Sequence, residues 1–254
     1  MDASDVLLLC LAAFAAGTLD AVVGGGGLIQ LPALLLVLPG FPVVSLLGTN
    51  KLASIVGTGS AAITYARHVD VHRRTAVQMC LAAFVGSGAG AYFATVVDGD
   101  VLRPVVLVAL AAVWLYTLRR PALGEIEIPR LTSQHQTGVA VTGGVFIGMY
   151  DGFLGPGTGS FLVFLLVGVV GLSFLHASAT SKAVNTTTNL AALILFGLGG
   201  HVLWGLGAAM ALCNLAGSQI GARLAIRRGS AWVRRVFLVV VAALILRLGF
   251  DVLT

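Results

Sequence analysis

Residues 22–32 read VVGGGGLIQLP, and they lie near the middle of an apolar run that extends over residues 6–38. As a single helix, a run of this length would be roughly 50 Å long, whereas the hydrocarbon core of a bilayer is about 30 Å thick. Consecutive glycines and a proline unwind a helix, because they remove side-chain support and a backbone donor. The sequence therefore predicts a helix that is broken near its middle.

The amino-acid composition is typical of a protein that is embedded in a lipid bilayer. Of its 254 residues, 58% are hydrophobic and 10% are charged, whereas soluble domains have about 25% charged residues. The mean hydropathy is +1.00. We therefore predict an all-α, polytopic membrane protein that crosses the plasma membrane several times. The net charge of +5 comes from arginines clustered between apolar runs, which indicates orientation in a bilayer rather than nucleic-acid binding.

The second half of the chain repeats the first without a gap. Asp151 aligns with Asp20 at an offset of 131 residues (151 − 20), and the same offset aligns the two lysines of the chain, Lys51 and Lys182. It also aligns Gly17 with Gly148, Gly24 with Gly155, Gly26 with Gly157, Thr49 with Thr180, and Gly90 with Gly221. Chance matching in Leu-rich segments does not explain aligned charges and glycines, so we predict a duplicated unit.

The duplication predicts a first transmembrane repeat at 1–118, a polar cytoplasmic linker at 119–135 and a second transmembrane repeat at 136–254. Each repeat begins with a long run, and the run of the second repeat is interrupted by FLGPGTGSF at 153–161. The apolar runs lie at 6–38, 44–65, 75–97, 101–118, 137–170, 176–197, 205–226 and 236–253.

The arginines predict how the runs cross the membrane. They gather after the second, fourth and seventh apolar runs. If each long run enters and leaves by the same face, all three clusters become cytoplasmic, as the positive-inside rule requires. Each repeat then has three crossings and a re-entrant hairpin. Because three is odd, the second repeat lies in the membrane with the opposite orientation to the first. The competing layout is a full crossing followed by a half-helix, because the limbs beside each break are unequal.

Four ionisable residues lie deep within apolar runs: Asp20, Lys51, Asp151 and Lys182. Such residues in a membrane usually face a partner or a cavity. One interpretation is an Asp–Lys ion pair that joins helices inside each repeat. The other brings both lysines close to a pseudo-two-fold axis, where they attract an anion. The aspartates are candidates for proton coupling, because burial favours the neutral form of a carboxyl group.

The neighbours of these charges favour the anion site. Ser, Thr and Asn residues surround each lysine and can line a cavity, although interhelical hydrogen bonds are the alternative. Each broken helix also exposes backbone N–H groups where its second limb begins, and oriented N–H groups bind anions. The predicted substrate-binding residues are Lys51, Lys182, Thr49, Asn50, Ser181, Asn185, Thr186, Gly25, Gly26, Gly27, Gly157, Thr158 and Gly159.

Other chemistries have no motif in this sequence. It contains no metal-ligand spacing, no Walker A motif and no Ser/His pair at catalytic spacing. We therefore expect no metal, no cofactor and no enzymatic activity. The expected partners are a small anionic substrate and the lipid bilayer, with no nucleic acid, and the sequence leaves a homo-oligomer open.

Four segments resemble the TauE/SafE family of membrane transporters: GTLDAVVGGGGLIQLPALL (17–35), GTNKLAS (48–54), DGFLGPGTGSF (151–161) and ATSKAVNTTTN (179–189). The resemblance covers nearly the whole chain. It implies a fold of duplicated halves and a small sulfur-containing anion, such as sulfite or an organosulfonate, as the substrate. It also implies that Asn50-Lys51 and Ser181-Lys182 contribute to the site, and the difference between Asn50 and Ser181 makes the half-sites unequal.

We therefore expect a secondary active transporter that works by alternating access. An anion channel on the same scaffold is the main alternative, because the sequence does not separate a pore from a carrier. An intramembrane enzyme is a third class, for which the sequence shows no nucleophile–base pair and no metal site.

Overall fold

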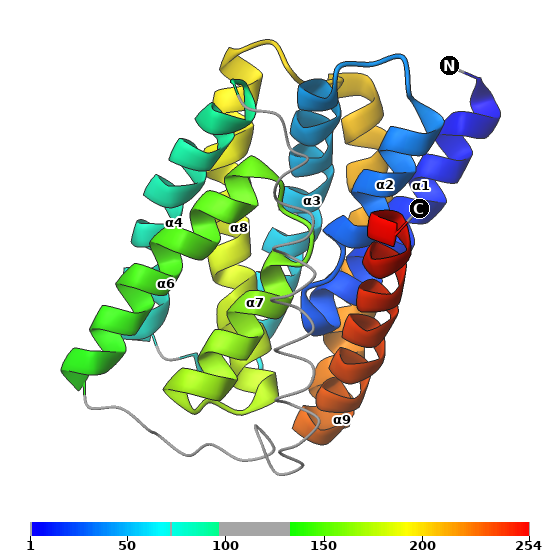
Figure 1. Ribbon diagram of the computed structural model, residues 1–254. Helices are drawn as coiled ribbons and strands as arrows, with labels where there is room; N and C mark the ends of the chain where they lie inside the picture. Colours follow the sequence, from blue (N-terminus) through cyan, green and yellow to red (C-terminus); the bar gives the residue numbers. More distant parts are fainter. Residues whose placement is uncertain (1, 72, 97–132, 254) are drawn as a thin grey trace.

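The computed structural model describes residues 2–71, 73–96 and 133–253, and its regular elements in these ranges are helices (Figure 1). They are α1 (Ala3–Val23), α2 (Gly27–Val37), α3 (Val43–Ala66), α4 (Arg73–Ala94), α6 (Ser133–Phe153), α7 (Thr158–Leu165), the π-helical turn η2 (Leu166–Val170), α8 (Phe174–Leu198) and α9 (Trp204–Leu253). The predicted apolar run at 101–118 and most of the predicted linker at 119–135 lie outside the described residues.

Both long apolar runs break at the predicted glycines. The first break follows α1 at Gly24, whose φ of 82° is left-handed and whose N–H donates to the Asp20 carbonyl. The second lies between α6 and α7, where Gly155 and Gly157 have φ values of 90° and 82°. These angles favour glycine, because a Cβ atom is unfavourable there.

The predicted contribution of the proline to the first break is wrong. Pro32 lies inside α2, and the helix continues through it to Val37. The ring removes one backbone donor, and packing around a transmembrane helix can accommodate that loss. The glycines before α2 therefore make the break.

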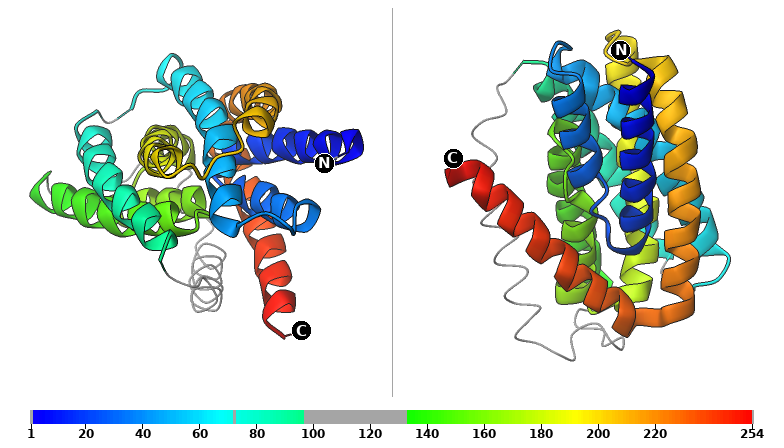
Figure 2. Two further views of the ribbon diagram at one scale, coloured as in Figure 1. Left: turned by 90° about the horizontal axis from the view of Figure 1, so that it is seen from above. Right: turned by 90° about the vertical axis from the view of Figure 1, so that its right-hand side faces the viewer.

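The two broken helices fold back as hairpins that open at opposite ends of the bundle (Figures 1 and 2). We call α1 with α2 the first hairpin and α6 with α7 the second hairpin. The first opens beside the N-terminus, at what we call the N-terminal end. The second opens at the end that holds the start of α4 and the kink of α9 at Gly229. We call this the arginine end, because Arg67 caps the C-terminus of α3, Arg73 and Arg74 begin α4, and Arg227 and Arg228 directly precede the kink.

The bundle is held together by close helix packing at glycines. Helix α1 packs against α9, and α4 packs against α6, while α3 and α8 contact each other. A Cβ atom added at Gly90 would overlap the Met149 backbone, and one added at Gly221 would overlap the Thr18 backbone. These two contacts involve positions related by the sequence offset (221 − 90 and 149 − 18 both equal 131). Small residues thus allow close helix approach at corresponding places in both halves.

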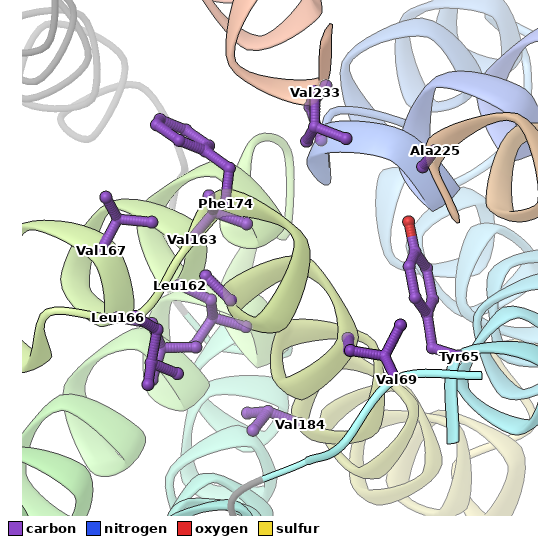
Figure 3. Packing of buried hydrophobic residues seen from close by; sticks show 14 of the residues in the cluster. Tyr65, Val69, Leu162, Val163, Leu166, Val167, Phe174, Val184, Ala225 and Val233 are labelled. Atoms are coloured by element: carbon purple, nitrogen blue, oxygen red, sulfur yellow. The ribbon is translucent and has the colours of Figure 1, made fainter. Parts of the chain in front are cut away.

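The largest hydrophobic cluster lies around α7, η2 and the start of α8. Figure 3 shows Leu162, Val163 and Leu166 from this region beside Phe174 of α8. Tyr65 at the end of α3 belongs to the same cluster, and its hydroxyl donates to the Ala21 carbonyl at 2.8 Å. The cluster therefore connects the second hairpin to α3 and to the end of α1.

The outer surface of the bundle is apolar. Leu7 and Leu11 on α1 are 62% and 59% exposed, and Leu81 and Val85 on α4 are 68% and 69% exposed. Large apolar side chains at the surface of two whole helices suit a lipid environment. Among the described helices, α1 and α4 have both the length and the apolarity of a membrane span. Helices α3 and α8 carry the buried polar residues that lower their hydropathy.

Candidate functional site

The four buried charges form two ion pairs that cross between the halves of the chain. Lys51 Nζ lies 2.9 Å from Asp151 Oδ2 and donates to the Asp151 carbonyl at 2.5 Å. Lys182 Nζ lies 2.9 Å from Asp20 Oδ2 and also donates to the Asp20 carbonyl. Each lysine therefore pairs with the aspartate of the other half, so the alternative of a pair inside each repeat is wrong.

The position of each aspartate near the end of its helix explains why lysine binds there. Asp20 lies in the last turn of α1, and Asp151 lies in the last turn of α6. The carbonyls at a helix C-terminus carry partial negative charge, which favours contact with a cation. Each ammonium group thus meets a carboxylate and a helix terminus together, and both lysines are buried, with Lys51 2% exposed and Lys182 0% exposed.

The turns of the two hairpins contact each other between these ion pairs. Ser160 N donates to the Gly24 carbonyl at 3.2 Å. A Cβ atom at Gly24 would overlap the Gly159 backbone, and one at Gly159 would overlap Gly24. The side chain of Ser160 also donates to the Val23 carbonyl. Two glycines therefore permit direct contact of the two broken segments.

A small cavity lies where the broken segments, α3 and α8 meet. It has a volume of about 20 Å³, which is room for roughly one water molecule. It is lined by Asp20, Gly24, Gly27, Asn50, Lys51, Ser54, Thr58, Asp151, Gly155, Gly159, Asn185 and Asn189. Seven of these are predicted site residues, including both aspartates, but the second lysine does not line the cavity. The structure thus brings residues of both predicted half-sites together around one small cavity.

The other predicted residues do not line the cavity, and three threonines among them hydrogen-bond to backbone atoms. Lys182, Thr49, Ser181, Thr186, Gly25, Gly26, Gly157 and Thr158 are absent from the cavity wall. Thr49 accepts from Leu203 N at 3.0 Å, which attaches α3 to the start of α9. Thr158 donates to the Gly155 carbonyl at 2.8 Å and stabilises the turn before α7. Thr186 donates to the carbonyl of Lys182 at 2.8 Å, within α8.

A buried cluster of amides was not predicted as part of the site. Gln30 Nε2 donates to Asn50 Oδ1 at 2.9 Å, and Asn214 Nδ2 donates to Gln30 Oε1 at 2.8 Å. Gln30 is 0% exposed and Asn214 is 3% exposed. These contacts fix the orientation of Asn50 in the cavity wall. The sequence feature that could have predicted these residues is an amide side chain within an apolar stretch, at Gln30 in α2 and at Asn214 in α9.

Two further polar residues occupy equivalent positions in the two halves. Asn189 Nδ2 donates to Thr58 Oγ1 at 3.5 Å, and their numbers differ by the sequence offset (189 − 58 = 131). A contact between equivalent residues is expected at a two-fold axis. Nearby, Asn185 Oδ1 is buried without a hydrogen-bond partner among the described residues. Asn185 also lines the cavity, and a buried polar atom without a partner is uncommon in proteins.

The residues present do not form a metal centre in the part of the chain that the structure describes. No group of three or more His, Cys, Asp or Glu residues there has the geometry to hold a metal ion. The chemistry available at the cavity is that of ammonium groups, carboxylates, amides and backbone N–H groups.

Comparison with known proteins gives matches over nearly the full length. Residues 9–248 match the family described as Sulfite exporter TauE/SafE. A probable membrane transporter protein, ORF9, of a Sinorhizobium species is 38% identical, over 96% of this chain and 92% of the relative. Probable membrane transporter proteins of Haemophilus influenzae and Escherichia coli K12, the latter named YfcA, are each 34% identical over 96% of this chain. The alignments cover 94% and 89% of those relatives. No solved structure matches the chain.

Proposed function

The chain belongs to the Sulfite exporter TauE/SafE family of membrane transporters, and from this premise we propose that it is a secondary active transporter of small sulfur-containing anions, such as sulfite or an organosulfonate. The observation that carries the proposal is the pair of buried ammonium groups beside the meeting point of two broken helices. Lys51 and Lys182 supply ammonium groups within an apolar bundle, where an anion would otherwise be strongly disfavoured.

The proposed architecture is two inverted repeats, at 1–118 and 136–254, in the plasma membrane. Two features support it: the hairpins open at opposite ends of the bundle, and glycine contacts recur at the sequence offset. The arginine end is then the cytoplasmic end, as the positive-inside rule requires. An anion site at the junction of the repeats follows the general pattern of transporters built from inverted repeats.

The positive ends of α2 and α7 are proposed to hold the oxygens of the anion. Among the described residues, the N–H groups of Gly27 and Gly159 donate to no protein acceptor, and both residues line the cavity. Asn50 and Asn185 supply amide groups to the same wall. A helix N-terminus and an ammonium group together favour an anion by dipole and by charge.

In this proposal, the present structure is a state whose central cavity has no room for the substrate. The cavity volume of about 20 Å³ suits a water molecule rather than a multi-atom oxyanion. Substrate entry therefore requires the hairpins to move apart at the Gly24–Gly159 contact. Separation towards the N-terminal end and then towards the arginine end would give alternating access. A centre this small favours such a carrier over a permanently open channel.

Transport in proteoliposomes tests the proposal. The purified chain is reconstituted and supplied with sulfite, methanesulfonate, thiosulfate or a carboxylate, and counterflow of each labelled anion is recorded. We expect saturable counterflow of sulfur anions, which is lost when Lys51→Ala and Lys182→Ala are combined. Arg228→Ala, which removes an exposed charge at the arginine end, serves as the control. Counterflow that survives the double substitution would refute the site, and single-channel current steps would favour a channel.

A further inference from the structure

The two ion pairs differ in how well each carboxylate is satisfied. Asp20 accepts from Lys182 at Oδ2 and, through a long hydrogen bond of 3.4 Å, from Gly26 N at Oδ1. Asp151, whose side chain is 4% exposed, has Lys51 as its cationic partner, and among the described residues its carboxylate accepts no backbone N–H. The Asp151 carboxylate therefore depends more heavily on one ammonium group.

The two lysines also differ in their access to the cavity. Lys51 lines it together with Asn50 and Asn185, whereas Lys182 does not. Gly155 preserves space beside the first ammonium group, because a Cβ atom there would lie 2.8 Å from Lys51 Nζ. An anion in the cavity thus meets Lys51, while Lys182 remains behind the Asp20 carboxylate.

We propose that the Lys51–Asp151 pair separates when the substrate binds, and that Asp151 takes up one proton for each monovalent anion bound by Lys51, while the Lys182–Asp20 pair stays closed. The proposal rests on the anion transport proposed above and assigns unequal roles to the two equivalent pairs. The proton enters from the side that supplies the anion and leaves with it on the other side, so that transport is electroneutral.

The charge of the site explains this stoichiometry. Two ammonium groups and two carboxylates sum to zero. A bound monoanion would leave one uncompensated negative charge in an apolar interior, which is strongly unfavourable. Once the anion occupies Lys51, the carboxylate that has lost its partner is Asp151. Protonation of that carboxylate restores neutrality without opening the second pair.

No other ionisable group in the described surroundings of Asp151 substitutes for this role. Lys51 on α3 and Asp20 on α1 share its cavity, and Lys182 on α8 is bound to Asp20. Tyr150, the preceding residue, donates its hydroxyl to the Pro156 carbonyl. Helix α7 contains no charged residue. Helix α4 has its arginines in its first turn, with Cys80 and Tyr92 as its other ionisable groups.

Proton uptake on binding tests the proposal separately from transport. Methanesulfonate is titrated into the purified full chain in detergent, by calorimetry in buffers of different ionisation enthalpy; this probe keeps its charge near neutral pH. We expect close to one proton taken up per anion in the unsubstituted protein. The same uptake is expected in Asp20→Asn, even where its affinity is lower, and uptake close to zero in Asp151→Asn.

The outcomes separate the two proposals. If neither methanesulfonate nor sulfite binds the unsubstituted protein, the anion site itself is wrong. If methanesulfonate binds without proton uptake, or if Asp20→Asn rather than Asp151→Asn abolishes the uptake, the assignment to Asp151 is overturned. If Asp151→Asn fails to fold, proton uptake by the unsubstituted protein and by Asp20→Asn still tests the proposal. In liposomes, Asp151→Asn should keep anion counterflow but lose uptake driven by a pH gradient.

Discussion

At the scale of single residues, the contribution of each lysine to stability can be measured separately from the anion binding proposed for Lys51. Lys182 is 0% exposed and bonded to Asp20, so Lys182→Met leaves a largely buried carboxylate without its cation. Breaking one side of a buried pair costs about 3–5 kcal/mol. We expect a markedly lower thermal midpoint in detergent, which a second substitution, Asp20→Asn, should largely restore.

The matched variant is Lys51→Met with Asp151→Asn, which neutralises the other pair in the same way. This double variant should unfold at a higher temperature than Lys51→Met alone. It should not bind methanesulfonate, because it lacks the ammonium group that lines the cavity. Equal binding by the two double variants would contradict the distinction between the pairs. A failure of Asp20→Asn to raise the midpoint of Lys182→Met would show that charge compensation is not the reason for the loss.

The identities of the buried charges could be predicted from the sequence, but their partners could not. A charge in an apolar run stands out wherever the run lies, so Asp20 and Lys51 were recognisable. Whether Asp20 pairs with Lys51 or with Lys182 depends on how the halves pack, which is a tertiary property. Gln30 shows the same limit: its identity as a buried amide is visible, but its contacts with α3 and α9 depend on the fold.

At the scale of helices, close packing depends on glycines at particular faces. Gly90 on α4 faces the backbone of α6, whereas nothing lies within 4 Å of a Cβ atom added at Gly88 on the same helix. Gly90→Ala should therefore separate α4 from α6 and cost about 1–3 kcal/mol. Gly88→Ala should be neutral or stabilise by about 0.5–1 kcal/mol, because alanine favours the helix.

Thermal unfolding of the two variants in one detergent is the measurement, and Gly221→Ala provides a second case in the contact between α9 and α1. If Gly90→Ala unfolded at the same temperature as Gly88→Ala, the close approach of α4 and α6 would be wrong. If Gly221→Ala lowers the unfolding temperature about as much as Gly90→Ala does, the result would agree with corresponding helix interfaces in the two halves.

The two helix breaks show which features of the helices are determined by the local sequence and which depend on packing. Four glycines at 24–27 predict an unwound segment because their backbone freedom is a property of the residues themselves. The continuation of α2 through Pro32 was not predictable in this way. It depends on the neighbouring helices that pack around α2, and the same neighbours turn each broken helix into a hairpin.

At the scale of the whole molecule, the hairpins give the bundle two chemically different ends. The first hairpin opens at the N-terminal end, and the second opens at the arginine end (Figure 2). Each broken segment therefore approaches the centre from a different side, and the ion pairs that cross between the halves hold the two segments together. The proposed alternating access requires such an arrangement, because the site must be uncovered from either side in turn.

The sidedness of the bundle can be measured with cysteines in intact cells. In a background in which Cys10, Cys80 and Cys213 are replaced by alanine, single cysteines are placed at Gly40 and Leu198, near the N-terminal end, and at Asp70, at the arginine end; all three positions are exposed. We expect a membrane-impermeant maleimide to label the first two from outside. The third should react only after permeabilisation, because arginine-rich ends stay in the cytoplasm.

Labelling of Gly40→Cys and Leu198→Cys from opposite sides would rule out the inverted arrangement, because these positions belong to different halves but to the same end of the bundle. If Asp70→Cys is labelled in intact cells and the other two cysteines are not, the inverted arrangement holds but its orientation in the membrane is the reverse of the one proposed.

Cysteine modification also tests alternating access. If the hairpins separate during transport, saturating methanesulfonate should change the rate of modification at a cysteine in the central cavity, such as Ser54→Cys, while the rate at Gly40→Cys stays constant.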